Sequence, residues 1–142
     1  MPKVLFSLSE ANAIVKKIKP LVERLEQLNE QLYLLDNTKI EFDDENMENF
    51  LLEVELNKNF HEKNVELYSI LGSLVKQGCV VRDIERHEYD FYSRFGDKEI
   101  ILCWDSREET IKNWHYVGET IEQRKPITIL QNSYYEQLKK MK

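Results

Sequence analysis

The stretch GCVVRDIERHEYDFYSRFGDKEIILCW, residues 78–104, decides the fold class because the hydrophobic pattern changes at its first residue. Upstream of Gly78, apolar residues recur every three or four positions, which is the spacing of amphipathic helices. Downstream, apolar and polar residues alternate in runs that are typical of strands, with turn residues between them. The runs are CVVRDI (79–84), EYDFYS (88–93) and EIILCW (99–104). The pattern predicts a three-stranded antiparallel sheet that follows a helical region.

The turns of this sheet predict which residues face each other. A hairpin centred on residues 86–87 places Asp83 directly opposite Asp90, and a turn at residues 96–97 places Asp90 opposite Cys103. Because side chains alternate between the faces of a strand, one face is predicted to be the core. The core face holds Val80, Ile84, Tyr89, Phe91, Ile100, Leu102 and Trp104, and the other face holds Asp83, Asp90 and Cys103 in a row.

The first helix is predicted to begin at a capping box formed by Ser7 and Glu10. A heptad seam follows, and Pro20 should kink or divide the helix near Lys19, because proline removes one backbone donor. Turn residues at 35–44 predict a bend. The apolar residues of the seam are Ala11, Ile14, Ile18, Leu21, Leu25, Leu28, Leu32 and Leu35.

A second long helix is predicted from about Asp44 to Lys76, with Gly78 at its C-terminal end. Its seven-residue rhythm has polar residues, Lys58 and His61, in the middle. Either neighbours such as Phe60 carry the apolar stripe there, or a polar layer fixes register or oligomeric state. The apolar members of the rhythm are Met47, Leu51, Val54, Val65, Tyr68 and Val75.

Two further capping boxes predict short helices near the C-terminus. Ser106 to Glu109 should open a helix through His115 that Gly118 closes, and Ser133 to Glu136 should open a C-terminal one. The predicted fold class is therefore α+β, in one domain: a long antiparallel helical hairpin, a three-stranded antiparallel sheet and short C-terminal helices. The corresponding ranges are 4–77 for the hairpin, 78–128 for the small sheet with its short helix, and 129–142 for the helical tail.

Composition and charge argue against several classes of function. The net charge is −6, and the stretch Glu41–Glu55 has no Lys or Arg, so direct nucleic-acid binding is disfavoured. No apolar run approaches the length of a membrane span, and the first residues lack the apolar stretch of a signal peptide, so a cytoplasmic location is expected. Cys79 and Cys103 are not in a C-x-x-C pair and are expected to be reduced and buried.

One candidate site emerges from the predicted register. Two opposed carboxylates, Asp83 and Asp90, repel unless solvent, a shared proton or a cation offsets them. If the predicted helix folds back, His115 could meet both, and such a set suits either a divalent metal or a general base. Alternatively, the aspartates are solvated and His115 caps its helix, where a cation is favourable. Trp104 and Trp114 are expected in the core.

The chain resembles the prokaryotic family known as "domain of unknown function 2203". The resemblance covers nearly the whole chain and rests on FSLSEAN (6–12), Gly78, Val80, Asp83, Asp90-Phe91, LCW (102–104), Trp114-His115, Gly118 and R-x-P-I (124–127). Two departures are a glycine that the family has in the first hairpin turn, here His87-Glu88, and a Gly-Glu pair that is replaced by SREE (106–109). The resemblance brings no activity. It implies signature positions at Asp83, Asp90, Cys103, Trp104, Trp114, His115 and Arg124.

Two functions are weighed on these observations. The favoured one is a non-enzymatic, self-associating interaction or scaffold module, a homo-oligomer through its helical hairpin. Its acidic face Glu41–Glu55 would then either meet a basic protein partner or simply keep the particle soluble. The alternative is a small divalent-metal-binding protein or metal-dependent enzyme that uses Asp83, Asp90 and His115, with Arg124 holding an anionic substrate. The chain has no P-loop, H-E-x-x-H or nucleophile elbow. A third class is a regulator that acts on a nucleic-acid machine through protein contacts.

Overall fold

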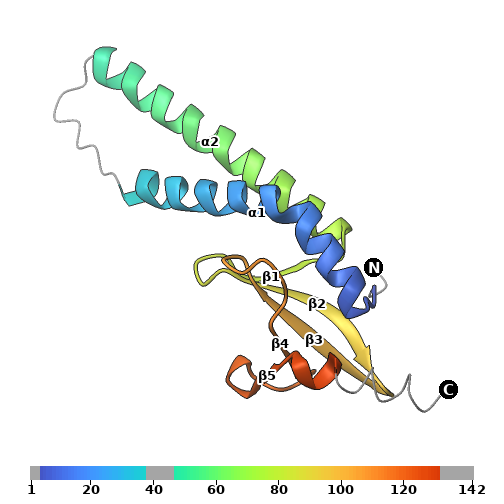
Figure 1. Cartoon of the computed structure of the whole chain (residues 1–142). Helices are drawn as coiled ribbons and strands as arrows, with labels where there is room; N and C mark the ends of the chain where they lie inside the picture. Colours follow the sequence, from blue (N-terminus) through green and yellow to red (C-terminus); the bar gives the residue numbers. More distant parts are fainter. Residues whose placement is uncertain (1–3, 38–46, 132–142) are drawn as a thin grey trace.

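The computed structural model describes residues 4–37 and 47–131, and it places two long helices before an antiparallel sheet (Figure 1). The α+β class is therefore confirmed. The sheet has five strands within these residues, in the order β1-β2-β3-β4-β5, rather than three. The start of the second helix at Asp44, most of the bend at 35–44 and the helix predicted from Ser133 lie outside the described residues.

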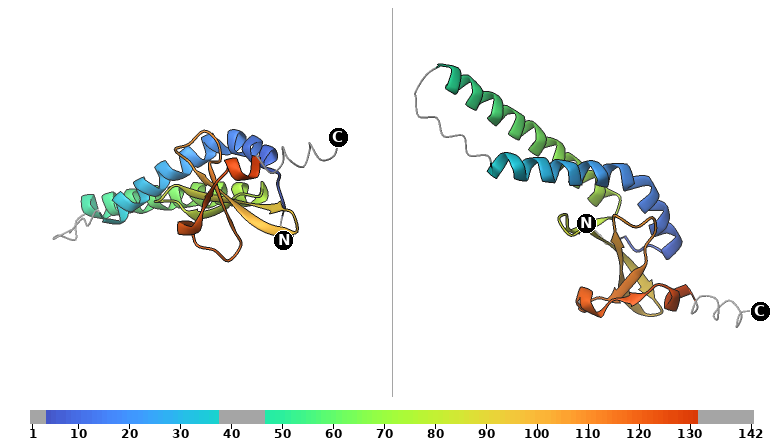
Figure 2. Two further views of the ribbon diagram at one scale, coloured as in Figure 1. Left: turned by 60° about the horizontal axis from the view of Figure 1, so that its bottom comes forward. Right: turned by 60° about the vertical axis from the view of Figure 1, so that its left-hand side comes forward.

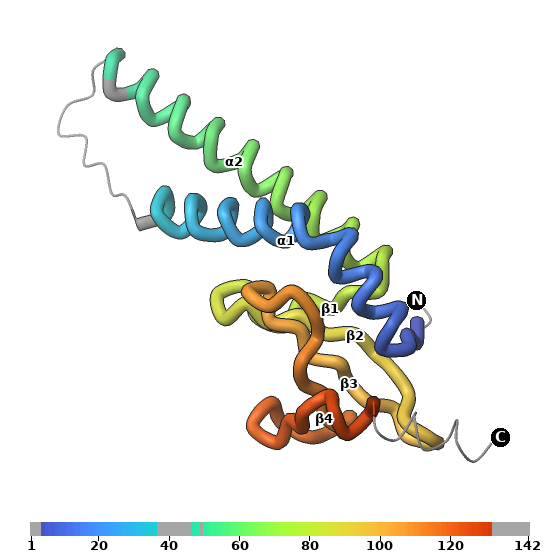
Figure 3. The backbone as a smooth tube through the Cα atoms, viewed as in Figure 1, coloured from blue at the N-terminus to red at the C-terminus, as the bar shows by residue number. Residues whose placement is uncertain are grey.

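Helix α1, Leu8–Asn37, begins at the predicted capping box. The Ser7 amide donates to the Glu10 carboxylate at 3.0 Å, and the Glu10 amide donates to Ser7 Oγ at 3.1 Å. Pro20 does not divide the helix, which runs on to Asn37 but changes direction in its first half (Figures 2 and 3). The heptad seam is confirmed in part, since Ala11, Ile18, Leu25, Leu28 and Leu32 are buried, whereas Val15 and Val22 are fully buried in place of Ile14 and Leu21, which are only partly buried, as is Leu35.

Helix α2, Met47–Lys76, returns alongside α1, and the two helices diverge toward the end of α1 and the start of α2 (Figure 1). Its inner face also has heptad spacing, but in a different register from the predicted rhythm. The partly or fully buried residues of that face are Leu56, Phe60, Lys63, Leu67, Ile70 and Leu74. The interpretation in which Phe60 replaces Lys58 and His61 at the helix contact is confirmed. Arg24 and Glu66 join the two helices through hydrogen bonds of 2.7 and 2.9 Å.

The residues of the predicted rhythm in α2 lie on the outer, solvent side of the helix. Met47, Val65 and Tyr68 are each about 70% exposed. Two heptad registers coexist in this sequence, and α1 covers only one of them. No helix within residues 4–37 and 47–131 is long and apolar enough to cross a membrane.

Gly78 ends α2 with φ of 86°, as predicted. The chain then enters β1 (Val80–Asp83), β2 (Glu88–Phe95) and β3 (Lys98–Asp105). The second hairpin has the predicted register, with Phe95 opposite Lys98 and Asp90 opposite Cys103. Tyr89, Phe91, Ile100, Leu102 and Trp104 are buried on the predicted core face.

The register predicted for the first hairpin is wrong. Val80 faces Asp90, Val81 faces Tyr89, and Asp83 faces Glu88, with a bulge between Val81 and Asp83. The bulge inserts one residue and reverses which side chains point to the core. Val80 is consequently 39% exposed, whereas Val81 packs against the core.

The short helix predicted from Ser106 to His115 is also wrong. Ser106 lies in a turn, and β4 (Asn113–Tyr116) pairs with β3 along its free edge. The Ser106 hydroxyl donates to Glu26 of α1 at 2.7 Å instead of capping a helix. Pairing with β3 places the Trp114 side chain on the core side of the sheet, where it is 1% exposed.

The remaining elements are short. They are a 3-10 turn η1 (Ile121–Gln123), strand β5 (Lys125–Pro126), which extends the sheet beyond β4, and a helical segment from Thr128. Buried residues of both helices and of the sheet form one hydrophobic cluster, and both tryptophans belong to it as predicted. The hairpin projects beyond the sheet (Figures 1 and 2). The core face of the sheet belongs to the same hydrophobic cluster as α1, and the opposite face carries Asp90, Cys103 and His115.

Candidate functional site

The polar face of the sheet brings side chains from three strands into one row. Asp90 of β2 faces Cys103 of β3, and Cys103 faces Asn113 of β4. Period-two alternation puts these three on the face opposite Tyr89 and Trp104. Of the predicted site residues, Asp90 and Cys103 are thus brought together as expected.

Arg82 occupies the place predicted for Asp83. It is the residue at the bulge of β1, and bulges re-aim side chains in this way. Its guanidinium forms an ion pair and hydrogen bond with Asp90 and lies 3.0 Å from His115 Nε2. One side chain thereby connects β1 to β2 and, across β3, to β4.

His115 joins the site from β4, where it faces Ile101 and is 2% exposed. Its Nδ1 lies 2.8 Å from the carbonyl oxygen of Tyr116, and Nε2 faces the Arg82 donor. A carbonyl can only accept and a guanidinium can only donate. These contacts therefore place the ring proton on Nδ1 and use the Nε2 lone pair, which leaves no ring nitrogen for a metal ion.

Asp83 lies apart from this group. Its Oδ1 accepts from the Arg86 amide at 3.1 Å, and the Arg86 side chain lies 3.8 Å away. The predicted Asp83, Asp90 and His115 ligands do not converge, because Asp83 pairs with Glu88 beside the turn, two positions along β2 from Asp90. Residues 4–37 and 47–131 contain no group of three or more His, Cys, Asp or Glu that could hold a metal ion.

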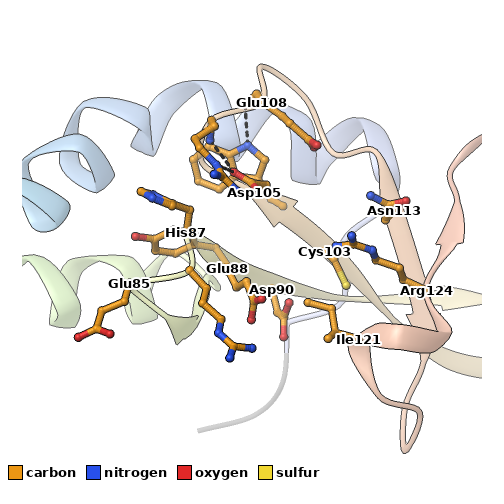
Figure 4. Close-up of a pocket in the computed structure, with 14 residues that line it drawn as sticks. Glu85, His87, Glu88, Asp90, Cys103, Asp105, Glu108, Asn113, Ile121 and Arg124 are labelled. Atoms are coloured by element: carbon orange, nitrogen blue, oxygen red, sulfur yellow. Dashed lines mark hydrogen bonds and ion pairs between the residues drawn. The ribbon is translucent and has the colours of Figure 1, made fainter.

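A pocket of about 460 Å³ opens on the polar face, between the turn after β1, the adjoining ends of β2 and β3, and the segment that carries Arg124 (Figure 4). Five carboxylates and three guanidinium groups line it. Arg107 pairs with Asp105 at 2.7 Å, and Arg86 with Asp83 at 3.8 Å. The carboxylates are Glu85, Glu88, Asp90, Asp105 and Glu108, and the guanidinium groups belong to Arg86, Arg107 and Arg124.

Arg124 reaches into this pocket and is shown beside Cys103 (Figure 4). In the described part of the chain its side chain has no hydrogen bond or ion pair. It acts on the Cys103 thiol through its charge. The structure therefore places Asp90, Cys103, His115 and Arg124 around one face, linked by Arg82, and leaves out Asp83.

Burial controls the ionisation of this site. It raises the pKa of Asp90, an effect that Arg82 opposes and the neighbouring Glu88 carboxylate reinforces. Burial likewise raises the pKa of Cys103 to about 11 and that of Cys79 to about 12. Both thiols are free, as expected, and stay protonated at neutral pH, so neither has the thiolate that nucleophilic catalysis requires.

A second polar cluster was not predicted. Glu26 of α1 lies 2.7 Å from His87 Nδ1 and accepts from Ser106 Oγ, and Ser106 also contacts the same ring nitrogen at 3.2 Å. In a catalytic triad the serine and the acid contact different ring nitrogens of the histidine, whereas here both contact Nδ1. The cluster therefore has a structural role: it connects α1 to two turns of the sheet. His87 has φ of 63°, a conformation that favours glycine, in agreement with the glycine that the resemblance places at this turn.

A family model described as "Uncharacterized conserved protein (DUF2203)" matches residues 4–127. The chain belongs to this family. The match spans both helices and all five strands, and it includes Asp90, Cys103, His115 and Arg124. Neither the search of curated proteins nor the search of solved structures finds a match.

Proposed function

We propose that this family member is a self-associating interaction module, in which α2 of one copy packs against α2 of a second copy. The observation that supports the proposal is the outer face of α2, where large apolar residues recur with heptad spacing and are exposed. This face, the α2 stripe, consists of Met47, Leu51, Val54, Lys58, His61, Val65, Tyr68, Gly72 and Val75.

The spacing of the α2 stripe favours a helix as its partner. Its steps alternate between four and three residues over the whole of α2, which is the pattern that allows one helix to pack along another. The apolar residues of this face are exposed on both sides of the polar pair Lys58 and His61, and large exposed apolar patches mark interaction surfaces. Tyr68, 69% exposed, is the type of residue that anchors interfaces.

The internal order of the stripe favours a second copy in an antiparallel arrangement. In one antiparallel register, Lys58 of each copy faces His61 of the other, so the polar residues meet at the centre. Val54 then faces Val65, Leu51 faces Tyr68, and Met47 faces Gly72, which offers room for it. A parallel arrangement would instead set Lys58 against Lys58 and the acidic first turns of the two helices against each other.

The acidic face Glu41–Glu55 stays a candidate surface for a basic protein partner. Its described part, residues 47–55, is the exposed first part of α2, where Phe50 and Leu52 are also exposed. An antiparallel pair would carry one such face at each end, which suits a scaffold that holds two partners apart.

Two neighbouring leucines provide a matched test of self-association. Leu51 belongs to the α2 stripe and is 55% exposed, whereas Leu52 is 47% exposed and lies beside the stripe. We expect the wild type and Leu52→Glu to be dimers at micromolar concentration, and Leu51→Glu to be a monomer, because it introduces a charge into the interface. Light scattering coupled to gel filtration measures the mass, and circular dichroism verifies the helix content. A monomeric wild type, or equal masses for both variants, would exclude this interface.

A further inference from the structure

The pocket on the polar face contains a buried carboxylate oxygen that has no partner. Asp90 is 7% exposed, and Arg82 donates to its Oδ2. Its Oδ1 is buried and has no hydrogen-bond partner in the part of the chain that the structure describes. Because an unsatisfied buried acceptor is unfavourable, a ligand that donates a hydrogen bond here removes an existing penalty.

The donor on such a ligand should carry a positive charge. Glu88 lies two residues before Asp90 on the same face of β2, and its charge acts on the Asp90 carboxyl group. The two carboxylates lie close together in Figure 4, and Glu88 has no hydrogen bond or ion pair with any described residue. Arg82 pairs with Asp90, whereas Glu88 has no counter-charge among the described residues, so an ammonium group between the two carboxylates balances the charge.

The opposite requirement holds on the other side of Cys103. Cys103 of β3 faces Asp90 of β2 directly, and neighbouring strands lie roughly 4.8 Å apart. Arg124 lies beside Cys103 in Figure 4, and among the described residues its guanidinium has no acceptor. The site therefore offers an acceptor for a cation and a donor for an anion, with a neutral thiol between them. An α-amino acid presents an ammonium and a carboxylate on one carbon atom and matches this pair of charges.

A third group selects among amino acids. Glu108 lines the same pocket, and its Oε2 is buried without a hydrogen-bond partner within residues 4–37 and 47–131. The segment that carries it is held by a hydrogen bond of 2.9 Å from Trp104 Nε1 to the Glu108 carbonyl. A second donor at the far end of the ligand satisfies this oxygen.

We propose that this pocket binds a free basic amino acid, with its α-ammonium on Asp90 and Glu88, its carboxylate on Arg124 and its side-chain donor on Glu108. The volume of about 460 Å³ lies within the range of small-molecule sites. The polar lining, in which Arg107 and Asp105 already satisfy each other, suits a charged ligand rather than an apolar one.

Two complete and three incomplete ligands test the proposal by isothermal titration calorimetry on the wild-type protein. L-Lysine and L-arginine carry all three groups. Cadaverine lacks the carboxylate, Nα-acetyl-lysine lacks the α-ammonium, and norleucine lacks the side-chain donor. We expect L-lysine or L-arginine to bind, and each of the incomplete ligands to bind at least about tenfold more weakly. The proposal is overturned if neither basic amino acid gives heat at millimolar concentration. It is also overturned if cadaverine or Nα-acetyl-lysine binds as tightly as L-lysine. If norleucine binds as tightly as L-lysine, the role of Glu108 is overturned.

Variants then test the assigned contacts. Arg124→Gln and Glu88→Gln change partly or fully exposed side chains, and both should weaken L-lysine binding about tenfold or more without lowering the unfolding temperature. Arg107 lines the same pocket, but Arg107→Gln removes only the partner of Asp105, so the affinity for L-lysine should stay within about twofold of the wild-type value. Unchanged affinity in Arg124→Gln, or an equal loss in Arg107→Gln, overturns the placement of the carboxylate. These measurements do not depend on the oligomeric state, so their failure leaves the proposed self-association untouched.

Discussion

Arg82 joins three strands through one guanidinium. It belongs to β1, pairs with Asp90 of β2 and donates to His115 of β4. Both partners are buried, at 7% and 2% exposed, and neither has another charged group to replace it among the contacts of the described residues. The cluster of Arg82, Asp90 and His115 thus holds three strands together on the same face as the proposed ligand pocket, and it fixes the orientation of Asp90.

Replacing Arg82 should destabilise the protein strongly. Arg82→Met leaves the Asp90 carboxylate buried without its partner, and removal of one member of such a pair costs about 3 kcal/mol or more in unfolding free energy. Arg86→Met provides the matched control, because its ion pair with Asp83 is 3.8 Å long and exposed, and such pairs contribute less than about 1 kcal/mol. Urea denaturation measures both. The double variant Arg82→Met, Asp90→Leu should recover part of the loss. Equal midpoints for the two single variants would contradict the proposed role of Arg82.

Part of the candidate site could be predicted from the sequence, because the register of one of its two hairpins, β2–β3, is fixed by a short turn. The Gly96-Asp97 turn fixes the second hairpin, so Asp90 opposite Cys103 could be predicted from spacing alone. The position of Asp83 could not, because the turn closes with Asp83 opposite Glu88 instead of opposite Asp90, and residue spacing does not fix the length of this turn. The role of Arg82 could not be predicted either, because Arg82 is the extra residue of a bulge, which has no signal in residue spacing. His115 was placed correctly in the site, although for the wrong reason, since it lies on a strand and not on a helix.

At the scale of elements, the two long helices were predictable because their patterns extend over many turns. In α2 the sequence alone does not decide which face packs against α1. The α2 sequence carries two heptad registers, and only tertiary packing decides which one meets α1. The segment 106–115 shows the opposite limit, since a capping box is a local preference of a few residues and pairing with the free edge of β3 outweighs it.

The end of α2 depends on Gly78. Its φ of 86° favours glycine, and a Cβ atom there would lie 2.5 Å from Phe6 Cε2. Gly78→Ala should therefore cost more than about 1–2 kcal/mol of unfolding free energy, which is the conformational strain alone. Gly72, in the last two turns of the same helix, has no atom within 4 Å of an added Cβ in a single copy, so Gly72→Ala should stabilise by about 0.5–1 kcal/mol when it is measured in the Leu51→Glu variant, where the proposed contact with Met47 is absent. Thermal unfolding separates the two alanine variants, and a shift of the same sign in both would contradict this account of the helix end.

The whole molecule separates two surfaces. The polar pocket is lined mainly by residues of the sheet and its turns, whereas the α2 stripe is exposed on the helical hairpin. The hairpin projects beyond the sheet (Figure 1). Pairing through α2 would therefore leave both pockets of a dimer open. The hydrophobic cluster packs α1 against the sheet and so joins the hairpin to the part of the molecule that carries the pocket. The proposed association and the proposed ligand site can thus operate in the same particle.

The direction of the proposed dimer can be established by cross-linking. In the antiparallel register, Val54 of one copy faces Val65 of the other, so mixing Val54→Cys with Val65→Cys proteins under mild oxidation should give a disulfide-linked dimer. Each variant alone should stay unlinked, because its cysteine faces a valine, and the wild-type control should not link, since Cys79 and Cys103 are buried with raised thiol pKa values. Non-reducing gel electrophoresis reads the outcome. Linked dimers in each variant alone would indicate parallel helices, and no link in the mixture would show that these two valines do not meet.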